Sequence, residues 1–124
     1  MYPALLDNLR LQHFRSYQDD SFEFGPGVNI IVGPNGSGKT NLLEAVLVLA
    51  TGSSYRVDDQ DLVSHGQDWA RLDAAMGGVN RCLKLTPSDF KTPKSFIIDD
   101  RSITRLPLPH IIPVVLFEPN HLLL

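Results

Sequence analysis

The sequence predicts an α+β fold in which a mixed sheet surrounds one helix and an antiparallel β subdomain lies beside them. Three observations lead to this prediction. A short apolar run at residues 28–32 is followed by a glycine-rich loop and then by a helical pattern over residues 41–50. Alternating segments typical of antiparallel strands precede the loop, and hairpin signals follow the helix.

The segments before the loop predict two paired strands. Apolar and polar residues alternate from residue 5 toward residue 14, which is the period of a half-buried strand. Asp19 and Asp20 then indicate a turn. The alternating residues 21–24 are expected to return antiparallel to the first strand.

The glycine-rich loop carries the strongest functional signal. Residues 33–40 read Gly-Pro-Asn-Gly-Ser-Gly-Lys-Thr, which fits the phosphate-binding pattern G-x-x-x-x-G-K-[ST]. The preceding run, residues 28–32, is apolar and β-branched, as in a buried strand. Residues 41–50 are expected to form a helix with an apolar face, made by Leu42, Leu43, Val46, Leu47 and Ala50. This order of strand, loop and helix is the context in which the pattern binds phosphate.

The residue types of the loop explain its chemistry. Glycines let the backbone approach an anion closely, and the N-terminus of the following helix adds unpaired N–H groups and a positive dipole end. Lys39 is expected to reach the β- and γ-phosphates of ATP, and the Thr40 hydroxyl is expected to ligate Mg²⁺. The expected nucleotide-binding residues of the loop are Gly33, Pro34, Asn35, Gly36, Ser37, Gly38, Lys39 and Thr40.

Further elements are expected after the helix. Gly52 is a plausible C-cap, and residues 58–65 suggest a short helix. Residues 69–76 and 81–85 are expected strands, joined by a Gly-Gly hairpin signal at residues 77–80.

The last third of the chain predicts another hairpin and a core strand. Residues 96–98 and 102–104 flank an Asp-Asp-Arg turn, whereas the three prolines of residues 106–113 exclude a regular helix longer than a turn. Residues 114–117 are expected to form a core strand. The expected core aromatic residues are Trp69, Phe96 and Phe117.

Composition favours a globular protein. Hydrophobic residues make up 43% of the 124 residues, and no run approaches the roughly 20 apolar residues of a membrane span. Cys82 is the single cysteine and is expected to be a small core residue, so an internal disulfide is excluded and a cytoplasmic location is the default. No secretory signal is apparent at the N-terminus.

The net charge of −3 is unevenly distributed. Residues 1–80 hold 5 Lys and Arg against 10 Asp and Glu, whereas residues 81–124 hold 6 against 4. This basic excess either forms a solvated strand face or contacts nucleic acid, and the first reading is favoured. Its members are Arg81, Lys84, Lys91, Lys94, Arg101 and Arg105.

Several segments resemble the SMC-like branch of the ABC ATPases, and more specifically the N-terminal lobe of the RecF family of DNA replication and repair proteins. The resemblance lies in residues 8–17, in residues 33–45 and in four later segments, and it covers nearly the whole chain. The later segments are residues 50–56, 61–66, 70–76 and 115–122.

The resemblance implies roles for residues outside the loop. Asn41 matches a position beside the nucleotide, and Arg15 matches a basic residue placed near it. Glu44 on the helix is expected to be an ion-pair partner and not a catalytic base. The signature motif, the acidic Walker B strand and the switch histidine would lie beyond residue 124, so the chain is expected to be a fragment.

The function implied by the resemblance is that of an ATP-gated homodimer. Such a dimer holds single-stranded or gapped DNA, works with recombination mediator proteins and assists loading of a recombinase. ATP hydrolysis is expected for the longer protein and not for this chain alone. Two alternatives stay open, a head fragment of another SMC-like or ABC-type ATPase and a non-catalytic remnant. A P-loop kinase is disfavoured by the strands that precede the loop.

Overall fold

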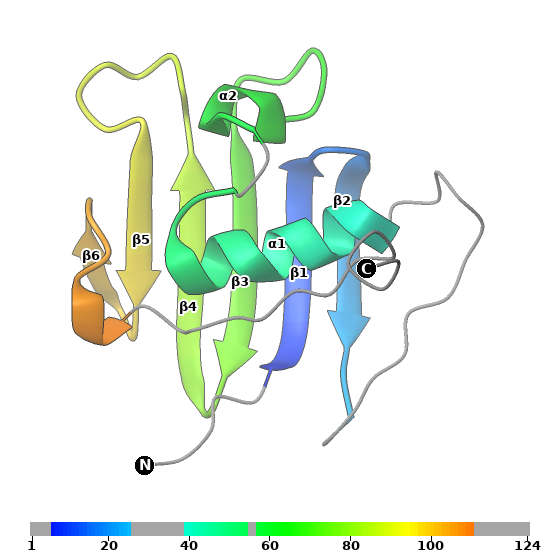
Figure 1. Ribbon diagram of the computed structural model, residues 1–124, viewed down its shortest axis with the longest axis vertical. Coiled ribbons are helices and arrows are strands. Elements are labelled where there is room, and N and C mark those ends of the chain that lie inside the picture. Colours follow the sequence, from blue (N-terminus) through cyan, green and yellow to red (C-terminus); the bar gives the residue numbers. More distant parts are fainter. Residues whose placement is uncertain (1–5, 26–38, 55–56, 111–124) are drawn as a thin grey trace, which may run out of the picture.

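The computed structural model describes residues 6–25, 39–54 and 57–110, with the side chains of Lys39, Thr40 and Leu108 left out. The described part is an antiparallel sheet with one long helix lying across it (Figure 1). The elements are β1 (Leu6–Phe14), β2 (Tyr17–Glu23), α1 (Lys39–Thr51), α2 (Asp59–Leu62), β3 (Ala70–Met76), β4 (Val79–Leu85), β5 (Lys94–Ile98), β6 (Arg101–Ile103) and the 3-10 turn η1 (Leu108–His110).

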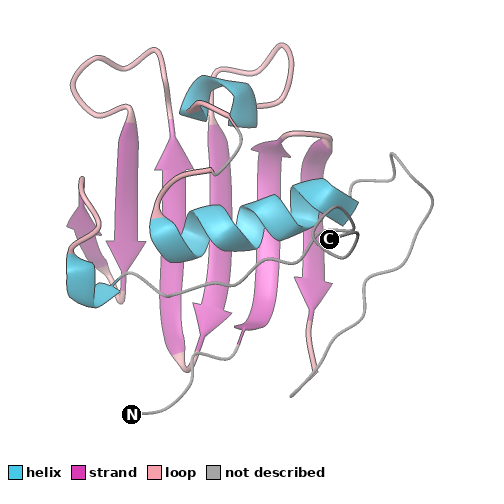
Figure 2. Ribbon diagram, in the orientation of Figure 1, coloured by secondary structure: helices cyan, strands magenta, loops and turns pink. Residues whose placement is uncertain are grey.

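The six strands follow the order β2-β1-β3-β4-β5-β6, and every neighbouring pair is antiparallel. Figure 2 shows α1 crossing one face of this sheet. The antiparallel subdomain and the helix are therefore confirmed. The two strands predicted to complete a mixed sheet, residues 28–32 and 114–117, lie outside the described residues.

The pairing of residues between neighbouring strands explains which face of the sheet becomes the core. Leu11 pairs with Leu72, Leu72 with Leu83, and Leu83 with Phe96, so one apolar side chain from each of four strands shares the helix-covered face. All four are at most 1% exposed. On α1 the residues packed in the same cluster are Leu42, Ala45, Val48 and Leu49. The predicted apolar face is therefore only partly right: Leu42 and Ala50 are buried, but Leu43 is 38% exposed, because the sheet covers the face that carries Ala45, Val48 and Leu49. Burial of these two apolar surfaces against each other is the main force that holds the helix on the sheet.

The opposite face of the sheet is polar. Arg10 forms a two-pronged ion pair with Asp19 on β2, with both N–O distances at 2.9 Å, and the hydrogen bond from Arg10 lowers the pKa of Asp19. Arg71 and Asp73 on β3 form a similar pair, which raises the pKa of Arg71. On this face one ion pair joins β1 to β2 and another lies within β3.

The predicted hairpins are confirmed. Ile98 pairs with Arg101 across the two-residue turn of Asp99 and Asp100, whose φ angles of 52° and 68° lie in the left-handed region. Positive φ at both central residues is the geometry of a type I′ turn, which suits the twist of the two strands. Gly77 and Gly78 make the corresponding turn between β3 and β4.

The turn predicted at Asp19 and Asp20 is wrong. Both aspartates lie inside β2, and the chain reverses earlier, between Phe14 and Tyr17, which pair with each other. Arg15 adopts a positive φ of 52° at this turn. The aspartates are accommodated in the strand because their side chains are solvent-exposed and Arg10 neutralises Asp19 across the sheet.

Two other expectations need correction. The short helix expected over residues 58–65 ends at Leu62, because Val63 instead forms a bridge with Phe14 at the end of β1. Trp69 was expected in the core, whereas it is 40% exposed and stacks on His13 with ring centroids 4.1 Å apart. Phe96 is buried as expected.

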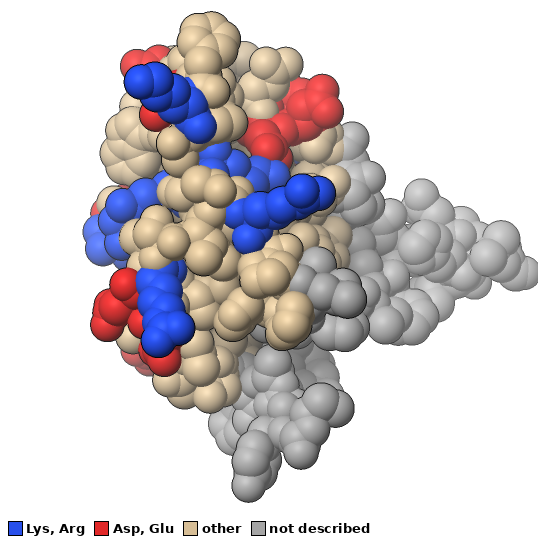
Figure 3. Space-filling view, turned by 90° about the vertical axis from the view of Figure 1, so that its left-hand side faces the viewer, with Lys and Arg blue, Asp and Glu red and all other residues tan. Residues whose placement is uncertain are grey.

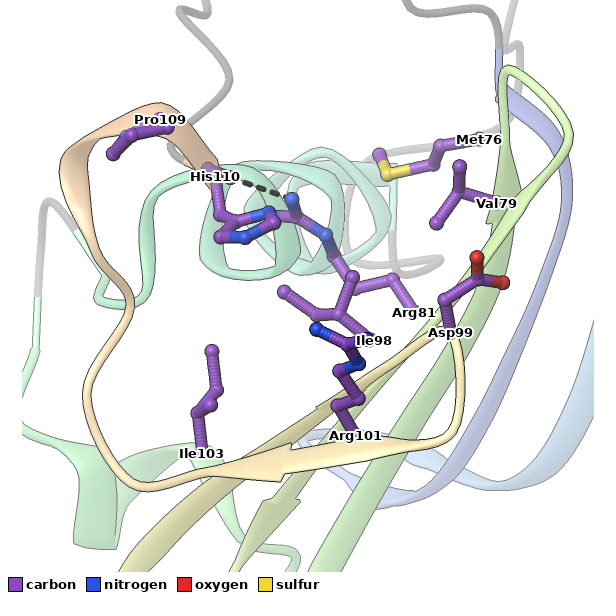
Figure 4. A pocket seen from close by; sticks show the side chains of 9 residues that line it. All are labelled: Met76, Val79, Arg81, Ile98, Asp99, Arg101, Ile103, Pro109 and His110. Atoms are coloured by element: carbon purple, nitrogen blue, oxygen red, sulfur yellow. Dashed lines mark hydrogen bonds between the residues drawn. The ribbon is translucent and has the colours of Figure 1, made fainter.

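The C-terminus of α1 is held by a glycine and a buried cation. Gly52 has a φ of 96° and donates its N–H to Val48 O, which confirms the predicted C-cap. Arg81, which is only 6% exposed, donates from Nη1 to Leu49 O at 2.8 Å and from Nη2 to His110 O (Figure 4). Burial lowers the pKa of Arg81. The negative end of the helix dipole and these carbonyls stabilise the guanidinium.

We predict that Arg81→Met destabilises the fold by about 1–3 kcal/mol, because the last carbonyls of α1 lose a buried charged donor. Urea unfolding at neutral pH measures the change. Lys84→Met, three positions along the same strand and on the exposed face, is the matched control and is expected to stay within about 0.5 kcal/mol of the unchanged chain. Equal effects of the two substitutions would contradict the capping role.

Cys82 is buried as predicted, and its burial raises the pKa of the thiol to about 11. The unfolded thiol loses its proton first, so we predict that unfolding free energy falls as the pH rises from about 9 toward 11. Cys82→Ala is expected to remove that part of the slope in urea titrations across this range. Rapid reaction of the folded thiol with a disulfide reagent at pH 8 would contradict the assigned burial.

Candidate nucleotide site

The candidate site lies at the N-terminus of α1. The loop residues Gly33, Pro34, Asn35, Gly36, Ser37 and Gly38 lie outside the described residues. The backbone of Lys39 and Thr40 forms the first helical positions of α1. An open pocket of about 780 Å³ adjoins this end of the helix, lined by Arg15, Ser16, Asn41 and residues between Val57 and Gln67.

Arg15 is fixed by its backbone at the edge of this pocket. Its N–H donates to Leu62 O at 2.8 Å, and its carbonyl accepts a hydrogen bond from the Ser64 hydroxyl at 2.7 Å. The Ser64 N–H donates in turn to His13 O. The β1–β2 turn is therefore tied to the segment that follows α2, which keeps Arg15 in its positive-φ conformation.

The side chain of Arg15 reaches a buried carboxylate on α1. Its Nε donates to Glu44 Oε1 at 2.8 Å, and the side chain of Glu44 is 0% exposed against 23% for Arg15. The second carboxylate oxygen of Glu44 accepts a hydrogen bond from the Ser54 hydroxyl at 2.7 Å. The expectation that Glu44 is an ion-pair partner is confirmed. One carboxylate thus links the β1–β2 turn, α1 and the segment after α1.

Asn41 is joined to the same turn. Its Nδ2 donates to the Ser16 hydroxyl at 3.3 Å, so the first turn of α1 contacts the residue after Arg15. Asn41 and Arg15, placed near the nucleotide by sequence resemblance alone, therefore lie in one pocket. Their contact with a nucleotide remains a prediction.

The described residues of the pocket fit a phosphate ligand. Arg15 supplies a guanidinium, Asn41 an amide and Ser16 a hydroxyl, and α1 directs the positive end of its dipole toward the same region. In the described ranges no group of three or more His, Cys, Asp or Glu could hold a metal ion. The assignment of Thr40 as a Mg²⁺ ligand stays a prediction, since its side chain lies outside the described part of the structure.

A second pocket, of about 640 Å³, lies at the opposite end of the sheet. Met76, Val79, Ile98 and Ile103 line it with apolar surface, and the side chains of Arg81 and Arg101 enter from β4 and β6 (Figure 4). The guanidinium of Arg81 is already bound by backbone carbonyls. This pocket contains none of the residues that sequence analysis assigned to the nucleotide.

Sequence analysis missed Ser16, Ser54 and Ser64 as parts of the site. Serine is common in turns, and their partners lie 10 to 49 residues away along the chain. No local pattern marks such contacts. Only the folded chain brings these hydroxyls to Asn41, Glu44 and Arg15.

We predict that Glu44→Gln destabilises the fold by about 3 kcal/mol, because Arg15 loses the charge of a buried partner. A double-mutant cycle with Arg15→Met, measured by urea unfolding, should give a coupling energy well above that of an exposed pair. The exposed pair Arg10–Asp19 supplies the matched cycle and is expected to give a much smaller coupling energy. Coupling energies of equal size would contradict the central role of the Arg15–Glu44 pair.

Comparison with known sequences relates the chain to an ATPase family. A family model described as AAA domain matches residues 8–105. The chain is 39% identical over 122 residues to the DNA replication and repair protein RecF of Symbiobacterium thermophilum, covering 94% of this chain and 32% of that protein. It is 44% identical over 69 residues to RecF of Geobacillus thermodenitrificans, covering 55% of this chain and 18% of that protein. The matched part thus spans about a third or less of these relatives.

Solved structures share the fold. One described as the recombination mediator protein RecF with ATP superposes with a TM-score of 0.75 at 24% identity, covering 83% of this chain and 29% of that one. A structure from work on ATP-driven dimerisation and DNA-stimulated activation of SMC ATPases gives a TM-score of 0.68 at 24% identity, covering 80% and 72%. At this identity the likeness establishes the fold.

The structure and the family match lead to the same assignment. The chain forms an antiparallel sheet with a helix that begins at Lys39, and the family model matches residues 8–105. The similarity to RecF proteins extends over most of the chain. The chain therefore belongs to the AAA domain family and has the fold of an ATPase head lobe, similar in sequence to RecF and in structure to RecF and SMC heads.

Proposed function

We propose that this chain is the ATP-binding lobe of a RecF-like DNA replication and repair ATPase. The observation that carries the proposal is the phosphate-loop pattern of residues 33–40 placed at the start of a helix that packs on an antiparallel sheet. The pocket formed by Arg15, Ser16 and Asn41 beside this helix supplies further donors for phosphate oxygens. The similarity to RecF proteins supports the same assignment.

In this proposal each residue has a distinct task. Backbone N–H groups of Gly33 to Gly38 cradle the phosphates, and Lys39 places a positive charge against the β- and γ-phosphates. Thr40 holds Mg²⁺, which neutralises charge on the phosphate oxygens when bound. Arg15, whose Nε is bound by Glu44 and whose Nη1 donates to Asp61 O, offers its remaining N–H groups to phosphate oxygens at the rim of the pocket.

The wider function is proposed from the relatives. The chain would work within an ATP-dependent homodimer that holds single-stranded or gapped DNA and acts with recombination mediator proteins in loading a recombinase. A cytoplasmic location fits this role. Within the described residues no helix is long and apolar enough to cross a membrane.

A second candidate is the head of another SMC-like ATPase. The structural likeness to an SMC ATPase supports it, with a TM-score of 0.68. The sequence matches to RecF proteins favour the first proposal. The two candidates share the ATP-binding role of residues 33–40.

We predict that Lys39→Ala weakens ATP binding about tenfold or more, because a charged hydrogen-bond donor to the phosphates is lost. Calorimetric titration of the chain with MgATP measures the affinity. Lys84→Ala, on the exposed face of β4, is the matched control and should bind like the unchanged chain. Urea unfolding of both variants checks that the fold is retained.

Equal ATP affinity of Lys39→Ala and the unchanged chain would contradict the phosphate-loop assignment. The purified 124-residue chain is also expected to show negligible ATP hydrolysis. Robust turnover that Lys39→Ala abolishes would show instead that these residues alone assemble a catalytic site.

A further inference from the structure

The loop between β4 and β5 exposes an aromatic ring. Phe90 is 99% exposed at the tip of residues 86–93. This loop lies at the same end of the sheet as the β1–β2 turn with Arg15, as the strand directions require (Figure 1). A fully exposed phenylalanine gains nothing from the core, and its ring face is open to a ligand.

The loop is folded, and its conformation holds the ring outward. Thr86 N–H donates to Pro93 O at 2.8 Å, and Asp89 N–H donates to Thr86 O at 2.9 Å. The Asp89 carboxylate accepts hydrogen bonds from the N–H groups of Lys91 and Thr92 at 3.0 and 3.1 Å. A side-chain acceptor of this kind stabilises the turn on both sides of Phe90. These hydrogen bonds order the turn and hold the Phe90 ring toward solvent.

The neighbourhood of the ring is polar and carries one cation, Lys91, and one carboxylate, Asp89, which is bonded to backbone N–H groups of the turn. Ser88, Asp89, Lys91 and Thr92 around Phe90 are all exposed. A protein-docking surface needs a contiguous apolar patch, and a single ring among polar groups does not provide one. A nucleic acid base needs one stacking face with a cation nearby for its phosphate. Lys91 is the residue next to the ring.

The basic excess of residues 81–124 separates into two groups in the structure. Arg81 caps α1, and Lys94 donates to Gly52 O and pairs with Asp59 at 2.8 Å. The other four side chains are exposed, and in the described part of the chain none of them has a recorded hydrogen bond or ion pair. They are Lys84, Lys91, Arg101 and Arg105. Figure 3 shows basic side chains on the β5–β6 side of the molecule, with acidic side chains next to them.

Phe90 also differs from the other exposed aromatic side chain of the described residues. Trp69 is already stacked on His13, whereas no ring contact is recorded for Phe90 in this part of the chain. A stacking base must present an uncovered face, which bases inside a duplex do not have. The geometry of the ring therefore selects unpaired nucleotides.

We propose that Phe90 and Lys91 form a contact for single-stranded DNA, in which an unpaired base stacks on the ring and a neighbouring phosphate lies against the Lys91 ammonium. This inference rests on the proposed function in that it assigns DNA to a particular loop of the lobe. The loop and the nucleotide pocket share one end of the sheet, so DNA at the loop would lie on the side of the lobe that carries the nucleotide.

Fluorescence anisotropy of a labelled oligo-dT titrated with the 124-residue chain tests the contact. Phe90→Ala is expected to weaken binding at least about fivefold, and Phe90→Trp is expected to retain it, because stacking needs only an aromatic face. An abasic oligonucleotide of the same length should bind the unchanged chain and Phe90→Ala equally. Val79→Ala, which alters an exposed apolar residue at the opposite end of the sheet, is the matched control.

Binding measured at a series of salt concentrations distinguishes the phosphate contact of Lys91 from the stacking contact of Phe90. Lys91→Ala is expected to reduce the slope of log affinity against log salt by about 0.7, the value for one phosphate contact on a single strand, whereas Phe90→Ala should leave the slope unchanged. Absence of oligo-dT binding, or equal affinity of Phe90→Ala and the unchanged chain, would overturn the proposal. Loss of self-association in Phe90→Ala with oligonucleotide binding intact would overturn it in favour of a protein contact.

ATP titrations of the same samples keep the two proposals distinguishable. A chain that binds MgATP but shows no effect of Phe90→Ala on oligonucleotide affinity would refute the DNA contact and leave the nucleotide assignment standing. A chain that binds oligo-dT through Phe90 but does not bind MgATP would refute the nucleotide assignment instead.

Discussion

The ion pair between Arg15 and Glu44 is the interaction on which the arrangement of the site depends. Glu44 is fully buried on α1, and a carboxylate in that position is stable only when its charge and its lone pairs are matched. Arg15 supplies the positive charge and Ser54 a hydroxyl donor, so turn, helix and following segment must meet at one point. Replacing Arg15 or Glu44 alone would break this ion pair at the buried carboxylate.

A second set of polar contacts holds the C-terminal end of α1. Arg81 enters from β4 and donates to the carbonyls at the C-terminus of α1, while Gly52 ends the helix in a left-handed conformation. Leucines on the sheet hold the middle of the helix through apolar packing. The helix that carries Lys39 and Thr40 is thus fixed at both ends and along its length. Such fixing favours phosphate binding, because donors that are already oriented lose little entropy when a ligand arrives.

Some charged side chains of the described residues pair with each other, and others are exposed without a partner. On the open face of the sheet, Arg10 and Arg71 each pair with an aspartate, whereas Lys84 is exposed without a partner among the described residues. Other exposed basic side chains lie on the β4–β5 loop, where Lys91 follows the exposed ring of Phe90, and on β6 and the segment after it. A lobe of net charge −3 could still attract a polyanion at this side, because local charge acts over about 10 Å at moderate salt.

The sequence by itself determined the elements whose signals are local. Helix α1, the two hairpin turns and the phosphate-loop pattern follow from periodicity, turn residues and glycine spacing, since each depends on neighbouring residues. The sequence did not locate the first turn, because exposed Asp19 and Asp20 mimic a turn while Arg10 keeps Asp19 in the strand. Only the tertiary structure decided the partners of Glu44 and the burial of Arg81. Both depend on contacts between groups 10 or more residues apart, and chain folding, not local preference, sets those distances.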